Sequence, residues 1–175
     1  MQFGKSDSQS KRGKPVKRLV AISVVGSLLM ACATERLESR GSTTRSEVCH
    51  VAKEAEIAAL FERWNMSLQS GDPRKVVSNY AEHSILLPTV SNKPRTTAEE
   101  KEDYFHHFLE NRPSGVINWR SIEVDCNTAI DTGLYTFTFG ANGKQVEARY
   151  TFTYKWFGNR WLITSHHSSA MPERD

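Results

Sequence analysis

The 175-residue sequence has few cysteines and no long apolar run, and both shortages limit what the protein can be. Its three cysteines form no CxxC pair and lack the spacing of a zinc site, which argues against redox or zinc chemistry. The uncharged apolar run over 19–31 has 13 residues, whereas a membrane-spanning helix needs roughly 20. No phosphate loop, GxGxxG pattern, HExxH pattern or Ser-His-Asp order occurs either. The sequence therefore predicts neither a cofactor nor a metal.

Basic charge is concentrated in the first 18 residues, which hold six Lys or Arg residues and one acidic residue. The remainder, residues 32–175, keeps 17 basic and 19 acidic residues, so its net charge is close to −2. A nucleic-acid-binding protein would carry a basic patch or stripe on its folded part. The charge pattern therefore excludes nucleic acid as the partner.

The N-terminal segment has the order of a lipoprotein signal. A basic stretch precedes the apolar run, and the small residue Ala31 precedes Cys32. We therefore expect residues 1–31 to be a cleaved signal peptide and Cys32 to carry the lipid that anchors the protein to a membrane; a buried, unmodified Cys32 is the alternative. Ala33 follows where an inner-membrane lipoprotein of enteric-type bacteria would have Asp, so we expect export to the periplasmic side of the outer membrane in a Gram-negative host. Residues 32–46 are small and polar, as in a flexible tether.

The two other cysteines, Cys49 and Cys126, form an even pair in an oxidising compartment. A disulfide between them is the main hypothesis, and two separate buried thiols are the alternative.

Residues 47–113 have helical patterns interrupted by turn signals. Apolar residues at helical spacing predict an amphipathic helix that ends at Gly71. Asp72 and Pro73 predict the start of a second helix over 73–81, and a short strand is expected over 84–87. Thr97 with Glu100 is a capping box that predicts a third helix, which ends before Pro113. The apolar residues of the first helix are Ile57, Leu60, Phe61, Trp64 and Leu68.

After Gly115 the sequence alternates apolar and polar residues, as strands do. Strands are expected over 116–124, 129–139, 145–157 and 161–168. Asn142-Gly143 and Gly158-Asn159 predict tight hairpin turns between them. The expected fold class is α+β, with the helices on one face of a mainly antiparallel sheet.

The order of these elements, Trp64, Gly71-Asp72 and the ending over 158–169 (GNRWLITSHHSS) carry a resemblance to a known superfamily. The chain over 47–173 resembles the nuclear transport factor 2-like superfamily. Within it, the chain is similar to the association domain of calcium/calmodulin-dependent protein kinase II and to SnoaL-like, SgcJ/EcaC-type bacterial proteins.

The resemblance implies a cone-shaped fold with three N-terminal helices packed on a curved sheet, a pocket inside the cone, and a homodimer or larger homo-oligomer. It leaves the function open, because one fold hosts several functions. An oligomerisation and small-ligand-binding domain without a kinase domain is the main hypothesis. The alternative is an enzyme of the cyclase, isomerase or oxidoreductase type acting on a small ring-bearing substrate. A third possibility is a structural domain with a filled core.

Two adjacent histidines close to the C-terminus are the candidate functional pair, and neighbours on a strand point to opposite faces. The resemblance places His167 where the kinase association domain has a pocket arginine, and alternation from Trp161 gives the same choice. We therefore expect His167 in the pocket beside Tyr150, with His166 as the substitute if the alternation is misassigned. In the enzyme alternative, His167 is the base and Tyr150 or Tyr104 is the oxyanion donor.

The remaining candidates are polar groups for the pocket mouth: Tyr104, Arg95 and His107. Trp64 and Tyr80 are expected to pack in the core instead. Asp125 and Asp131 are interpreted as turn residues, which leaves the enzyme alternative without an acid in the pocket.

Overall fold

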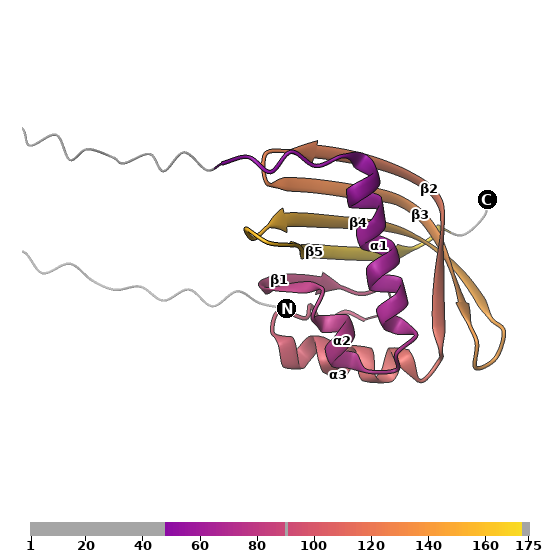
Figure 1. Ribbon diagram of the computed structural model, residues 1–175. Helices are drawn as coiled ribbons and strands as arrows, with labels where there is room; N and C mark the ends of the chain where they lie inside the picture. Colours follow the sequence, from indigo (N-terminus) through magenta and orange to yellow (C-terminus); the bar gives the residue numbers. More distant parts are fainter. Residues whose placement is uncertain (1–47, 90, 173–175) are drawn as a thin grey trace, which may run out of the picture. The chain divides into compact units, whose positions relative to one another are not determined.

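Helices and strands follow one another in the expected α+β order (Figure 1). The computed structural model describes residues 48–89 and 91–172; the expected signal peptide, the tether and Cys32 lie outside these ranges. Within them, no helix is long and apolar enough to span a membrane. The elements are α1 (Glu54–Leu68), α2 (Pro73–Val77), β1 (Tyr80–Leu87), α3 (Ala98–Leu109), β2 (Pro113–Asp125), β3 (Thr128–Phe139), β4 (Gln145–Trp156) and β5 (Trp161–Ala170).

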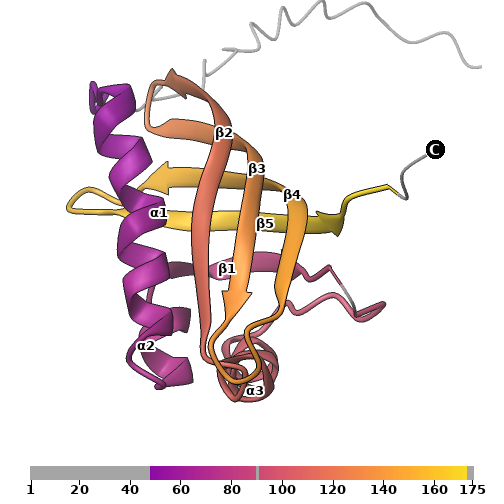
Figure 2. The same ribbon diagram turned by 90° about the vertical axis from the view of Figure 1, so that its right-hand side faces the viewer.

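The five strands form one mixed sheet in the order β1-β5-β4-β3-β2. Strands β2 to β5 are an antiparallel meander, as expected, and β1 joins the edge of β5 in parallel. Gly133 lets β2 approach β3 closely, because a Cβ atom at this position would collide with the carbonyl oxygen of Trp119. The sheet is strongly curved, and α1 lies across its inner face while α3 closes one end (Figure 2).

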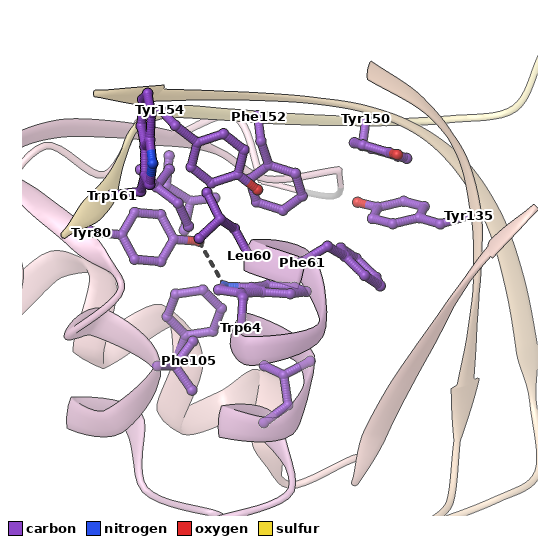
Figure 3. Packing of buried hydrophobic residues seen from close by; sticks show 14 of the residues in the cluster. Leu60, Phe61, Trp64, Tyr80, Phe105, Tyr135, Tyr150, Phe152, Tyr154 and Trp161 are labelled. Carbon is purple, nitrogen blue, oxygen red and sulfur yellow. Dashed lines mark hydrogen bonds between the residues drawn. The ribbon is translucent and has the colours of Figure 1, made fainter. Parts of the chain in front are cut away.

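The first helix supplies the centre of the core. Its five expected apolar residues are all buried against the sheet, and Phe61 and Trp64 are at most 1 % exposed. Aromatic rings from α1, β1, α3 and the sheet meet these side chains (Figure 3). Most pairs among them are tilted or edge-to-face, the arrangements that aromatic quadrupoles favour.

The second helix is shorter than expected, and the strand after it begins earlier. Helix α2 ends at Val77, and β1 starts at Tyr80 rather than at Ser84. Asn79 explains the early end, because its side-chain amide donates hydrogen bonds to the carbonyl oxygens of Lys75 and Val76. The carbonyl of Asn79 then accepts a hydrogen bond from Ile163, which starts the pairing with β5. The capping box of Thr97 and Glu100 is present as expected.

A disulfide joins Cys49 to Cys126, so the pairing expected from the sequence is confirmed. It fastens the segment before α1 to the turn between β2 and β3. The His50 backbone N–H donates to the side-chain oxygen of Asn127 at 2.8 Å, and the His50 ring stacks on Trp156 at 3.7 Å. The segment before α1 is therefore held in place by the contacts of His50 as well as by the disulfide.

Candidate functional site

The interior of the cone contains a cavity of about 290 Å³ at the end closed by α3. This volume is at the lower limit of the range for small-molecule sites. The walls are mainly aromatic, and a few polar groups interrupt them. The aromatic walls include Trp64, Tyr104, Phe108, Tyr135, Phe137 and Phe139, and the polar groups include Thr89, Asn111, Lys144, His166 and Ser168.

His166 is the histidine among the described residues that line the cavity. It is 4 % exposed, its ring stacks on Phe152 at 4.0 Å, and its Nδ1 lies 2.8 Å from the Tyr80 hydroxyl. Its Nε2 has no hydrogen-bond partner within the described part of the chain. Burial, followed by the proximity of His167, lowers the pKa of His166 to about 3. The ring is therefore neutral at physiological pH and keeps one nitrogen free for a ligand.

Hydroxyl groups surround Ser168, two residues further along β5 and on the same face. Tyr135 donates a hydrogen bond to Ser168 Oγ at 2.5 Å, and the Thr89 hydroxyl lies 2.5 Å from the same atom. Burial raises the pKa of Tyr135 well above its ordinary value, so its hydroxyl keeps its proton. His166 and Ser168 thus give the cavity one polar end.

The prediction that His167 enters the cavity is wrong. His167 is exposed on the outer face of the sheet, and its register partner on β4 is Thr151. The reason is a β-bulge: Tyr154 pairs with Ile163 and Thr153 pairs with Ser165, which leaves one extra residue on β5. This residue reverses the alternation, so Ile163 and His166 both face inward.

Tyr150 is buried, but it does not line the cavity. Its hydroxyl donates a hydrogen bond to Asp131 Oδ1 at 2.8 Å, and the Asp131 Oδ2 atom lies 3.5 Å from Arg120 Nη2. Burial is the main reason that the pKa of Asp131 is raised. The interpretation of Asp131 as a turn residue is wrong, because it is fully buried within β3. The alternation of Asp131 with Tyr135 could have revealed its inward direction.

The three candidates for the pocket mouth separate in the structure. Tyr104 lines the cavity, and burial raises its pKa to about 12. The Arg95 guanidinium lies outside the lining, 5.8 Å from the Tyr104 ring centre, and pairs with Asp103 at 3.1 Å. His107 is exposed beside Glu110 and does not reach the cavity. Only Tyr104 therefore has the expected position.

Sequence reasoning missed four polar groups of the lining: Thr89, Asn111, Lys144 and Ser168. Ser168 lies two residues after His166 on the same strand, so both side chains point to the same face. This spacing indicates Ser168 once the direction of His166 is known. Trp64 and Tyr80 pack in the core as expected, but Trp64 also lines the cavity and Tyr80 contacts His166. In the described part of the chain, no three His, Cys, Asp or Glu side chains cluster as metal ligands do.

The curved sheet wrapped around α1 and the aromatic cavity define a nuclear transport factor 2-like domain. A nuclear transport factor 2-like protein of unknown function from Pseudomonas putida KT2440 superposes with a TM-score of 0.62 at 17 % identity, covering 72 % of this chain and 92 % of that chain. An iota-carbonic anhydrase from a cyanobacterium, solved in complex with bicarbonate, superposes with a TM-score of 0.64 at 19 % identity. The match covers 73 % of this chain and 97 % of that chain. At these identities the likeness concerns the fold.

The family follows from a sequence match. The model of the calcium/calmodulin-dependent protein kinase II association domain matches residues 53–172, so the chain belongs to this family. A Xanthomonas campestris protein assigned to the same domain is 48 % identical, with a TM-score of 0.66, and the match covers 73 % of this chain and 97 % of that chain. Comparison with the curated proteins gives no match.

Proposed function

We propose that this chain is an exported, lipid-anchored and self-associating domain whose cavity binds a small oxyanion, with bicarbonate as the ligand. The observation that carries the proposal is the polar end of the cavity. There the free Nε2 atom of His166 and the hydroxyl of Ser168 lie on one face of β5, and aromatic walls enclose them. Preorganised donors in a site shielded from water bind developing or full negative charge strongly.

The chemistry of the lining agrees with a small planar anion. Ser168 and Thr89 each carry a hydroxyl, and Lys144 is the cationic residue among the lining residues. No carboxylate is among the described residues that line the cavity, so no negatively charged side chain there repels an anion. The cyanobacterial protein of the same fold, solved with bicarbonate, supports this ligand class. A ring-bearing carboxylate is the competing ligand, since the aromatic walls would also hold a ring.

Reversible hydration of carbon dioxide is a second candidate function, and the contrast between the two ends of the cavity favours it. Carbon dioxide is apolar and suits the aromatic walls, whereas its product is an anion that suits the polar end. In this reaction the oxygen of water bonds to the carbon, one C=O π pair moves onto oxygen, and a proton leaves to the buffer. With a pKa of about 3, His166 is a weak base, so its role is to stabilise the charged oxygen.

Removing either polar group should weaken ligand binding. His166→Ala and Ser168→Ala are each expected to raise the bicarbonate Kd roughly tenfold or more, because a hydrogen bond to a charged group contributes about 1.5–3 kcal/mol. Titration of ¹³C-labelled bicarbonate followed by NMR measures the Kd, and stopped-flow indicator assays measure hydration of carbon dioxide.

The adjacent residue is the matched control, since His167→Ala removes the same ring from the outer face. It should leave both measurements unchanged. Equal effects of His166→Ala and His167→Ala would contradict the proposed site. Binding of benzoate but not of bicarbonate by the wild-type protein would favour the ring-bearing ligand instead.

Self-association is proposed to use the outer face of the sheet, where a second copy of the chain would pack. A shallow hollow on this face is lined by Trp119, Leu134, Thr151 and His167, and Trp119 is 57 % exposed. Aromatic residues are enriched in protein interfaces. The name of the matching family, an association domain, supports an oligomer.

A charge in the lining of this hollow should separate the copies. Trp119→Asp is expected to shift the sedimentation mass from that of an oligomer to that of a monomer, while the circular dichroism spectrum stays unchanged. Asn142→Asp, on the exposed β3–β4 turn, adds the same charge away from the face. A monomeric wild-type protein, or an oligomeric Trp119→Asp variant, would contradict this interface.

The lipid anchor is proposed from the sequence alone, because Cys32 lies outside the described residues. Cys32→Ser is expected to move the protein from the membrane fraction to the aqueous fraction in a detergent phase separation. Its mass should also lack the acyl chains. Retention in the membrane fraction with an unchanged mass shift would refute lipidation at this residue.

A further inference from the structure

Three buried side chains from different elements form a hydrogen-bonded chain that ends at the cavity. Trp64 on α1 lies with its Nε1 atom 3.2 Å from the Tyr80 hydroxyl on β1 (Figure 3). The same hydroxyl lies 2.8 Å from His166 Nδ1 on β5. All three side chains are at least nine-tenths buried, so water does not compete for these contacts.

The chemistry of the donors sets the direction of these two hydrogen bonds. An indole nitrogen only donates, so the Tyr80 oxygen accepts from Trp64. The hydroxyl proton of Tyr80 then has His166 Nδ1 as its acceptor. The opposite arrangement, with the proton on Nδ1, would leave a buried Tyr80 O–H without a partner, which costs about 1–3 kcal/mol.

We propose that Tyr80, oriented by Trp64, is a positioning residue that fixes His166 as the tautomer with its proton on Nε2. A neutral imidazole carries one proton, so accepting at Nδ1 makes Nε2 the donor. The free nitrogen in the cavity wall is therefore an N–H group. The cavity selects ligands that offer an oxygen acceptor and discriminates against ligands that offer only donors, such as ammonium groups.

The preference for bicarbonate as the ligand rests on the proposed function, whereas the tautomer of His166 does not depend on it. Long-range ¹H–¹⁵N NMR spectra distinguish the protonated from the unprotonated ring nitrogen of each histidine. The purified full chain is expected to show His166 with its proton on Nε2 only. In Tyr80→Phe, which removes one oxygen atom and keeps the ring, the two ring ¹⁵N shifts of His166 should move toward each other as the Nδ1–H tautomer becomes populated.

Tyr154→Phe is the matched control, because the Tyr154 hydroxyl is equally buried and has no hydrogen-bond partner within the described residues. It should leave the His166 tautomer unchanged. The bicarbonate Kd of Tyr80→Phe should rise by the reciprocal of the Nε2–H fraction, about twofold for equal populations.

A wild-type His166 protonated on Nδ1, or a Tyr80→Phe variant that keeps a pure Nε2–H tautomer, would overturn the positioning role. If the tautomer behaves as expected and the wild-type protein does not bind bicarbonate, the ligand assignment fails and the positioning role stands.

Discussion

Loss of the Cys49–Cys126 disulfide is expected to lower the free energy of unfolding by about 4 kcal/mol. The two residues are 77 positions apart, and closing a loop of this length removes much entropy from the unfolded chain. A small domain is typically stable by only about 5–15 kcal/mol, so this loss is a large share of the total. Guanidinium unfolding curves of the double variant Cys49→Ser/Cys126→Ser and of the wild-type protein measure the difference.

Two controls make the disulfide result specific. Cys32→Ser removes a cysteine outside the pair and should leave the unfolding curve unchanged. The cavity lies at the opposite end of β3 from the disulfide, so the folded double variant should still bind bicarbonate. If the free energies of unfolding of the double variant and of the wild-type protein agree within about 1 kcal/mol, the packing of His50 on Trp156, rather than the disulfide, holds the segment before α1.

Acid is expected to destabilise the protein through His166. Its pKa is about 3 in the folded state, compared with an ordinary value of 6.5. Between these values the unfolded chain binds a proton at this ring and the folded chain does not. The free energy of unfolding therefore falls by up to about 1.4 kcal/mol for each pH unit below 6.5, which amounts to about 2.7 kcal/mol at pH 4.5.

His166→Gln isolates this contribution, because Gln does not titrate and preserves hydrogen-bonding capacity at the position. Two other groups also make the free energy of unfolding depend on pH. Asp131 has a raised pKa in the folded state, so its effect on the free energy of unfolding is opposite to that of His166 as the pH falls. Glu100 has a pKa of about 2 in the folded state, so its stabilising contribution is lost as the pH falls below its ordinary value of 4.5. Both groups are present in both proteins, so they cancel in the difference. Parallel stability profiles from pH 7 to 4.5 would show that His166 is protonated in the folded state.

The sequence predicts most of the framework because its signals are local. The helical spacing from Ile57 to Leu68 gives α1, and the Asn-Gly turn at 142–143 gives the β3–β4 hairpin. The early start of β1 could not be predicted in this way. It depends on a hydrogen bond between Asn79 and Ile163, residues that are far apart in the sequence.

The polar end of the cavity was harder to predict, because one bulged residue on β5 decides which histidine faces inward. A bulge depends on how two strands pair, so the residues of one strand alone do not show where its inward and outward directions change over. The burial of the Asp131 carboxylate also depends on tertiary contacts, because a hydrogen bond from Tyr150 and the nearby Arg120 guanidinium stabilise it. The family resemblance indicated the correct strand but pointed to His167, one residue away from His166, which lines the cavity.

The most direct test of this account is a bicarbonate titration of the ¹⁵N-labelled protein followed by NMR, with sodium chloride as the ionic-strength control. The His166 Nε2–H and the Ser168 amide resonances are expected to shift with saturation, and the His167 ring resonances are expected to stay in place. Bicarbonate that leaves His166 and Ser168 unchanged, or that shifts His167 instead, would contradict it.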